Sequence, residues 1–286
     1  MADENMERKR RFYAMGANWR SVPLVLGSIV LAAGCTSTPK TEIPASVPEL
    51  YPGILTGYLQ KNALPDSLAL LPPQPAADSK AFAADEEAYR ATRKLRDTHR
   101  WMLASEDADL RFPQAADSFS CALDMPIRQD STPHLYMLMR RSLTDAVLAT
   151  YSAKNHYQRR RPFATYGDST CTPGDEAMLS KDGSYPSGHA ALGWAWALIL
   201  AEMAPERSNA LFARGLDFGQ SRIICGMHWQ SDVTAGRVAG AATVAMLHTN
   251  PVFRAEFDEA RKEVASAHAK GMKPAHNCQA EAAARR

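Results

Sequence analysis

The stretch Ala190-Ala-Leu-Gly-Trp-Ala-Trp-Ala-Leu-Ile-Leu-Ala-Glu-Met-Ala204 decides the fold, because it is apolar on almost every face of a helix. A helix without a polar face has to be surrounded by the rest of the protein, so we expect residues 190–204 to form the central helix of a bundle. The apolar run stops at Glu202, short of the roughly 18 residues that identify a membrane span. The stretch therefore predicts a buried helix in a soluble body.

Helical patterns continue on both sides of this stretch. Apolar side chains recur at helical spacing in residues 79–104, 134–154, 208–225, 231–248 and 252–269. We find no alternating apolar and polar segment long enough for a convincing strand, and no internal repeat. With 45% apolar and 22% charged residues, the composition excludes a disordered or coiled-coil chain. The sequence predicts an all-α, single-domain helical bundle.

The first 35 residues have the pattern of an export signal. Basic residues at 8–11 precede an apolar run at 22–34, which is shorter than the roughly 20 residues of a membrane span and typical of a signal peptide. Leu31-Ala-Ala-Gly-Cys35 resembles a bacterial lipobox, although Ala32 stands where Leu is commoner. Plain cleavage and a buried N-terminal helix stay open as alternatives. We expect export to the periplasm, with Cys35 lipidated and anchored in the outer membrane.

The charge balance is close to neutral. Lys and Arg total 33 against 31 Asp and Glu, and the first 34 residues hold five of the basic and three of the acidic side chains. That leaves 28 of each sign in the rest of the chain. A neutral body argues against nucleic acid as an electrostatic partner.

Four cysteines remain besides Cys35, namely Cys121, Cys171, Cys225 and Cys278. An even number in an oxidising periplasm predicts two disulfides, for which three pairings are open, and free buried thiols are the alternative. Their spacings match no zinc-site template. We favour a bond between Cys171 and Cys225, because both flank the polar segments described next.

Three basic side chains stand where the chain should form a core. Lys154 falls seven residues after Val147, on the inward stripe of its helix. Arg222 falls four residues after Phe218, also inward, and Arg161 ends a run of three arginines. A buried cation is costly unless it meets an anion. One such residue would be expected to pair with a nearby Asp or Glu, but three of them beside two histidines predict a shared anion site.

The two histidines stand in polar motifs. Ser184-Tyr-Pro-Ser-Gly-His189 is a rigid turn before the apolar helix. In it Ser187 offers a hydroxyl, Gly188 allows close approach of the backbone, and the first amides of the helix are free to bind an anion. His228 and Asp232 lie four residues apart, so one helical turn brings the carboxylate to the imidazole and orients it. The pattern indicates an anion-binding site with an oriented histidine.

Together these segments resemble a known family signature. The three parts are Lys154-x6-Arg161-Pro162, Pro186-Ser-Gly-His189 and Ser221-Arg222-x5-His228-x3-Asp232, separated by 23 and 31 residues. They are similar to the three-part signature of the acid phosphatase and vanadium haloperoxidase superfamily. Segments 183–189 and 221–232 resemble the bacterial class A non-specific acid phosphatases in particular. The resemblance implies the helical bundle of that superfamily.

The resemblance covers most of the chain and sets the domain boundaries. The Pro-, Ser- and Thr-rich stretch 36–78 shows no sustained period, which indicates a tether and an extended arm. We expect a lipoprotein-type signal peptide at 1–34, a tether at 35–64, an acid phosphatase catalytic domain at 65–270 and a C-terminal tail at 271–286.

A role for each matched residue follows from the resemblance. His228 is the expected nucleophile that forms a phosphohistidine, Asp232 orients it, and a protonated His189 is the expected general acid. The phosphate group is expected to be held by five further positions, Lys154, Arg161, Ser187, Gly188 and Arg222. The implied activity is hydrolysis of a broad range of small phosphate monoesters, with transfer to an alcohol where it replaces water.

No cofactor or metal is expected. His189, His228 and Asp232 are a candidate ligand set for a divalent ion, but three converging cationic side chains oppose one. Members of the family are commonly homo-oligomers, so we expect a homodimer. Alternative activities for the same site are a nucleotide-specific apyrase or pyrophosphatase, a lipid phosphatase and a vanadate peroxidase. A non-catalytic phosphate-binding envelope lipoprotein is the alternative outside the enzymes.

Overall fold

The computed structural model describes residues 41–285, and the expected signal peptide and Cys35 lie outside them. Within these residues nearly all of the regular secondary structure is helical, which confirms the all-α prediction. The two short strands, β1 (Glu49–Tyr51) and β2 (Ile54–Leu55), pair as one antiparallel hairpin. None of the described helices is both long and apolar enough to cross a membrane.

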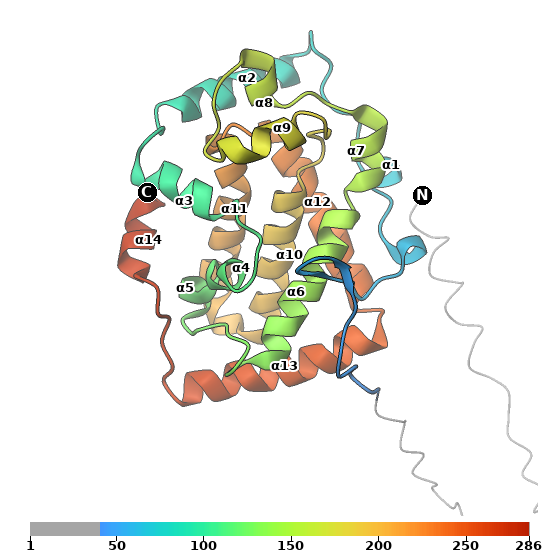
Figure 1. Cartoon of the computed structure of the whole chain (residues 1–286), viewed down its shortest axis with the longest axis vertical. Helices are drawn as coiled ribbons and strands as arrows, with labels where there is room; N and C mark the ends of the chain where they lie inside the picture. Colours follow the sequence, from blue (N-terminus) through green and yellow to red (C-terminus); the bar gives the residue numbers. More distant parts are fainter. Residues whose placement is uncertain (1–40, 286) are drawn as a thin grey trace, which may run out of the picture. The chain divides into compact units, whose positions relative to one another are not determined.

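The apolar stretch forms the centre of the bundle, as its sequence predicts. Around α10 (Gly188–Met203) lie α6 (Pro133–Leu148), α11 (Ser208–Ile224) and α12 (Gln230–Leu247), and α13 (Pro251–Ala269) crosses the end of the bundle where α10 finishes (Figure 1). Trp196 in α10 is fully buried, and its indole N–H donates to the Met139 carbonyl of α6 at 3.3 Å. The bundle thus buries most of α10, and past its first turn only the stripe of Trp194, Leu198 and Glu202 is partly or fully exposed.

Helix α12 approaches α10 closely at two glycines. A Cβ at Gly240 would lie 2.2 Å from the Ala191 carbonyl oxygen, and one at Gly236 would lie 2.4 Å from that of Ser187. No side chain fits in such a space, so glycine is required at both positions. The contact brings the first turns of the two helices together, and the Ser187 N–H donates to the Asp232 carbonyl at 2.9 Å. Two of the predicted motifs become neighbours in this way.

The remaining elements cover the ends and sides of the bundle. Helices α2 (Lys80–Arg93), α8 (Pro162–Tyr166) and α9 (Glu176–Leu179) lie at the end where α10 begins (Figure 1). The other short elements are η1 (Lys61–Ala63), α1 (Ser67–Leu70), α3 (His99–Glu106), α4 (Gln114–Asp117), α5 (Ser120–Leu123), α7 (Tyr151–Tyr157), η2 (Pro173–Asp175), η3 (Pro205–Arg207) and α14 (Cys278–Ala284).

Two of the expected helices are each broken into two. The stretch 79–104 splits into α2 and α3 around Asp97, whose φ of 61° is left-handed. The stretch 134–154 splits into α6 and α7, because the Thr150 hydroxyl donates to the Val147 carbonyl at 2.7 Å and competes with the regular helical bond. Helical periodicity alone does not show such local side-chain competition. The second break sets the direction of α7.

The packed body extends beyond the expected range 65–270 at both ends. The carboxylate of Asp145 in α6 accepts the backbone N–H of Tyr58 at 2.8 Å, so the end of the expected tether is docked on the bundle. In the expected tail, Cys278 in α14 is bonded to Cys121. Composition did not show these contacts, because they depend on buried backbone groups finding partners far away in the sequence.

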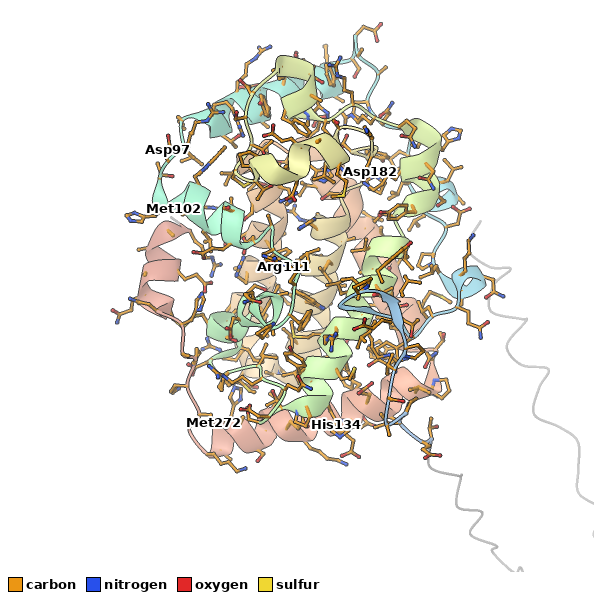
Figure 2. The ribbon with its side chains drawn as sticks, in the orientation of Figure 1. Asp97, Met102, Arg111, His134, Asp182 and Met272 are labelled. Carbon is orange, nitrogen blue, oxygen red and sulfur yellow. A yellow bond between two sulfur atoms is a disulfide. The ribbon has the colours of Figure 1, made fainter. Side chains whose placement is uncertain are left out.

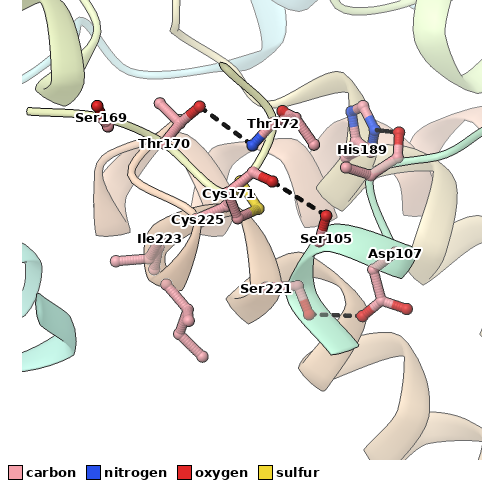
Figure 3. Close-up of a disulfide and its surroundings, with 12 residues drawn as sticks. Ser105, Asp107, Ser169, Thr170, Cys171, Thr172, His189, Ser221, Ile223 and Cys225 are labelled. Atoms are coloured by element: carbon pink, nitrogen blue, oxygen red, sulfur yellow. Dashed lines mark hydrogen bonds between the residues drawn. A yellow bond between two sulfur atoms is a disulfide. The ribbon is translucent and has the colours of Figure 1, made fainter. Parts of the chain in front are cut away.

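All four cysteines of the body are paired. Figure 3 shows the bond between Cys171 and Cys225, which is the pairing that the sequence analysis favours. It joins the segment after α8 to the end of α11. The hydroxyl of Ser105 donates to the Cys171 carbonyl at 3.0 Å and ties α3 to the same place. The Cys121–Cys278 bond links α5 to α14, across 157 residues of sequence.

Candidate active site

The predicted site residues converge where α10 begins. Ser187 is the N-cap of α10, and its hydroxyl accepts the Ala190 N–H at 3.3 Å. Helices α7, α8, α11 and α12 all reach this point with one end or with the adjoining loop. The residues brought together are Lys154, Arg161, Ser187, Gly188, His189, Arg222, His228 and Asp232. These residues therefore form one cluster at the start of α10.

The surroundings of His228 fix which of its nitrogens carries the proton. Nε2 lies 3.0 Å from Nη1 of Arg161, and a guanidinium can only donate, so Nε2 must hold the lone pair. Nδ1 then carries the proton and faces Oδ2 of Asp232 at 3.4 Å, a long contact of the kind that often shortens when a substrate binds. The predicted pairing of carboxylate and imidazole is present. The lone pair of Nε2 accepts the Arg161 donor and so faces the cationic cluster.

Asp232 has a second partner that sequence reasoning missed. Its Oδ2 accepts the Trp229 N–H at 2.8 Å, while its Oδ1 accepts a hydrogen bond from Nη1 of Arg159 at 2.6 Å. The other side of the Arg159 guanidinium reaches Asp85 of α2 at 2.7 Å. Arg159 stands in the arginine run from which the sequence analysis selected only Arg161. Asp232 was the feature that could have pointed to Arg159. A buried carboxylate needs a cation as partner, and a neutral histidine does not supply one.

Lys154 and Arg161 are held in place by one acidic residue that the sequence analysis did not identify. Asp182 lies between α9 and α7 (Figure 2), with Oδ2 at 2.9 Å from Nη2 of Arg161 and 3.7 Å from Nζ of Lys154. Nζ of Lys154 also donates to the Gly183 carbonyl at 2.7 Å. Burial, with the charge of Arg161 next, lowers the pKa of Lys154 to about 8. Lys154 is therefore a cation at neutral pH, but it loses its proton at a lower pH than an ordinary lysine.

Arg222 differs from the other cations because no carboxylate of the described residues forms an ion pair with it, and Asp175 and Asp107 attract it only at longer range. The side chain is 1% exposed, and its Nε and Nη1 have no hydrogen-bond partner among residues 41–285. Burial and then the charge of Arg161 lower the pKa of Arg222 to about 9, so it stays protonated at neutral pH. The Ser184 hydroxyl nearby in the motif is likewise buried and unpartnered. Buried donors without acceptors are costly, which indicates that an anion completes this pocket.

Burial and the neighbouring cations keep both histidines of the site neutral. Burial, followed by the charges of Arg161, Lys154 and Arg222, holds the pKa of His228 well below its usual value, and a hydrogen bond with the Ser184 backbone only partly opposes this. The pKa of His189 is also well below its usual value, through burial and then Arg222. The expected protonated state of His189 is thus absent without a ligand, because the surrounding cations disfavour a further positive charge.

The ring of His189 is oriented from outside the predicted motifs. Its Nε2 lies 3.2 Å from the Ala108 carbonyl, to which it donates when neutral. The neighbouring Asp107 accepts a hydrogen bond from the hydroxyl of Ser221 at 2.5 Å (Figure 3). Arg214 binds the same carboxylate. The segment that contacts His189 is therefore fixed to α11, which gives the motif residue Ser221 a structural purpose.

The candidate metal-ligand set is not assembled as such. Among residues 41–285 no group of three or more histidine, cysteine or acidic side chains lies close enough together to hold a metal ion. The charged groups around His228 are instead one carboxylate, Asp232 at 3.4 Å, and the cations Arg161, Lys154 and Arg222. The arrangement suits a multiply charged anion, with a nitrogen nucleophile on one side of it.

Comparison with known proteins agrees with this geometry. The family profile described as "PAP2 superfamily" matches residues 134–255. The chain is 44% identical over 240 residues to the non-specific acid phosphatase of Providencia stuartii, which covers 84% of this chain and 94% of the relative. It is 45% identical over 195 residues to that of Salmonella typhimurium, covering 68% and 78%, and 40% identical over 209 residues to an acid phosphatase of Zymomonas mobilis, covering 73% and 79%. The chain therefore belongs to the class A non-specific acid phosphatases of the PAP2 superfamily.

Proposed function

We propose that this protein is an exported acid phosphatase that hydrolyses a broad range of phosphate monoesters through a phosphohistidine at His228. The single observation that carries the proposal is the pairing of two features in one pocket. Arg222 is buried with unpartnered donors, and His228 is neutral with its Nε2 lone pair facing the same cationic cluster. A phosphate group bound there would satisfy the donors and meet the nucleophile.

Binding uses charge and hydrogen-bond direction together. A phosphoryl group in transfer carries negative charge on three equatorial oxygens, which a set of converging cations stabilises. Arg161 and Arg222 offer planar forks that match phosphate geometry, and Lys154 adds a point charge. The first amides of α10, at Gly188 and after it, favour an anion because they lack helical partners. Nη1 of Arg161 faces Nε2 of His228 and its Nη2 donates to Asp182, so phosphate would bind Arg161 by replacing these two contacts.

The chemistry follows from the protonation states. Nε2 of His228 attacks phosphorus, the bond from phosphorus to the leaving oxygen breaks, and His189 transfers a proton to that oxygen. In the second half, His189 takes a proton from water, the resulting hydroxide attacks phosphorus, and His228 leaves as the neutral imidazole. A bound phosphate dianion offsets the charge of Arg222 and so raises the pKa of His189 into a useful range. The substrate thereby generates its own general acid.

Further elements of the proposal rest on the same pocket or on the sequence. Three cations around the oxyanion replace the charge that a metal would supply, so turnover is independent of divalent ions. An alcohol that takes the place of water in the second half gives phosphotransfer. Cleavage before a lipidated Cys35, location in the periplasm at the outer membrane, and a homodimer remain proposals from the sequence and the family resemblance. The relatives' name "non-specific" supports a broad substrate range here.

The test is to trap the intermediate. The protein is mixed with 32P-labelled phenyl phosphate in the presence of EDTA and quenched in alkaline denaturant, because phosphohistidine is labile to acid. We expect labelled protein and steady turnover, and loss of both in His228→Ala. His248→Ala is the matched control, since His248 lies at the far end of α12 and contacts Glu202 at 3.1 Å. Labelling that persists in His228→Ala, or turnover abolished by EDTA, would refute the mechanism, and tight binding without turnover would indicate a phosphate-binding protein.

A further inference from the structure

Arg159 is a buried cation with no place in the phosphate pocket. Its Nη1 donates to Oδ1 of Asp232 at 2.6 Å, and its Nη2 donates to Oδ2 of Asp85 at 2.7 Å. All three side chains are buried, and the guanidinium lies 5.4 Å from the centre of the Trp229 ring. A planar guanidinium donates in fixed directions, so the two carboxylates are fixed relative to each other.

Asp85 is itself anchored at the start of α12. Its Oδ1 accepts the backbone N–H of Ser231 at 2.7 Å, and its Oδ2 accepts the Ser231 hydroxyl at 2.5 Å. The same hydroxyl accepts a hydrogen bond from Nη1 of Arg159 at 2.7 Å. These contacts form a closed network that joins α2, the segment before α8 and the first turn of α12. Asp232 is left with one oxygen, Oδ2, for Nδ1 of His228 and the Trp229 amide.

The geometry points to Arg159 as a positioning residue for the reaction: with Asp85 it aims Asp232 at His228, and its charge limits how strongly that carboxylate attracts a proton onto the imidazole. The inference rests on the proposed function, in which His228 attacks as the neutral ring. An orienting carboxylate has two opposed effects. It holds the ring in the right tautomer, but its negative charge also favours the imidazolium, which cannot attack. A cation on the other oxygen keeps the first effect and weakens the second.

Every charged group around the pair contributes to this balance. The titratable groups that interact electrostatically with His228 are Lys154, Arg161, His189, Arg222 and Asp232. Those that interact with Asp232, besides His228, are Arg159, Lys154, Arg161 and Tyr185. The cations of the phosphate pocket lose much of their effect on His228 once an anion binds there. Arg159 lies behind Asp232, away from that anion, so its contribution persists in the substrate complex.

The main test compares the pH dependence of kcat/KM in three variants. In Arg159→Gln we expect the acid limb to move up by about one pH unit, because Asp232 then acts on His228 without compensation. Asp85→Asn removes the negative charge on the far side of Arg159. The acid limb of kcat/KM in this variant should therefore stay at the same pH or move to lower pH. Arg160→Gln is the matched control. Arg160 is the exposed neighbour of Arg159, and among residues 41–285 its side chain donates one hydrogen bond, to the Ala164 carbonyl, so Arg160→Gln should leave the acid limb of the pH profile unchanged.

A direct readout separates positioning from structural damage. The titration of the His228 ring is followed by NMR in the full chain with 13C-labelled histidine, and its signal is assigned by its absence in His228→Asn. It should move to higher pH in Arg159→Gln. Arg159→Lys keeps the positive charge but loses the planar guanidinium that donates to both carboxylates. The pH titration of the His228 ring should therefore stay near that of the parent, while kcat falls.

Three results would overturn the inference. One is a folded Arg159→Gln that loses activity equally at every pH, with an unchanged His228 titration. Another is an upward shift in Asp85→Asn, which decides the matter even if Arg159→Gln does not fold. A third is an Arg159→Lys whose titration shifts as far as that of Arg159→Gln. A parent protein that forms no phosphohistidine would instead refute the proposed function itself.

Discussion

Two arginines on the same helix show how this protein treats buried charge in two ways. Arg214 and Arg222 lie eight residues apart on α11, and each is 1% exposed. Arg214 pairs with Asp107 and Glu281 and donates to the Ser118 carbonyl at 2.7 Å. Burial works against its charge, but the charge and hydrogen bond of Asp107, together with the charges of Glu281 and Asp217, outweigh burial and leave the pKa of Arg214 raised. Arg222 has no such partners, and burial lowers its pKa to about 9.

The difference separates a charge that holds the fold from one that holds a ligand. Arg214 is neutralised by the protein itself, so its contacts fix α11 to α14 and to the segment that contacts His189. Nε and Nη1 of Arg222 have no partner among the described residues, and the charges of Asp175 and Asp107 offset only part of the desolvation of this cation. The two sites therefore predict opposite outcomes when each arginine is replaced by methionine, which has a similar length and no charge.

The largest effect should be on stability at Arg214. Arg214→Met leaves the carboxylates of Asp107 and Glu281 buried without a cation, so we expect a loss of about 3–5 kcal/mol in the free energy of unfolding. Urea unfolding of the oxidised protein measures it. The specific activity of the folded fraction should stay close to that of the parent. A variant as stable as the parent would show that Arg214 does not hold the fold.

The reverse is expected at Arg222. Arg222→Met should reduce kcat/KM for p-nitrophenyl phosphate by about 10²–10³-fold, which is the usual cost of one donor to a developing oxyanion. Its stability in phosphate-free buffer should equal or exceed that of the parent, because an uncompensated buried cation is removed. Steady-state kinetics and urea unfolding on the same preparation check both parts. A loss of stability as large as that of Arg214→Met would end the distinction between the two residues.

Ligand-induced stabilisation sharpens the comparison by a smaller amount. Phosphate at one hundred times its dissociation constant should stabilise the parent by about 2.7 kcal/mol, since the anion binds only the folded state. Thermal unfolding with and without inorganic phosphate measures the effect. The shift should largely disappear in Arg222→Met and persist in Arg214→Met. An equal shift in both variants would place the anion elsewhere.

The smallest effect is the alkaline limit of activity. Burial lowers the pKa of Lys154 to about 8, so its charge is lost as the pH rises through that value. We expect kcat/KM to decline above about pH 8 in the parent. In Lys154→Arg the decline should begin at higher pH, because a guanidinium stays protonated there. An identical alkaline limb in the two proteins, measured with the same substrate, would show that another group controls it.

Much of the site could be predicted because its residues are local in sequence. The Lys154, Arg161 and Arg222 positions stand out as cations on inward faces, and the spacing of His228 and Asp232 corresponds to one helical turn. Asp85, Arg159 and Asp182 could not be assigned in the same way. Each looks like an ordinary charged residue of a helix or loop, and only its distant partner gives it a role.

The sequence by itself determined the all-α class, the central position of α10 and three cations, Lys154, Arg161 and Arg222, on inward faces, because helical periodicity and uncompensated polarity are properties of neighbouring residues. Only the tertiary structure decided the charge states and the tautomer. The proton on Nδ1 of His228 follows from Arg161 lying 3.0 Å from Nε2, and the neutrality of His189 follows from burial beside Arg222. Both depend on Coulombic interactions and desolvation among groups far apart in the chain, which no local pattern encodes.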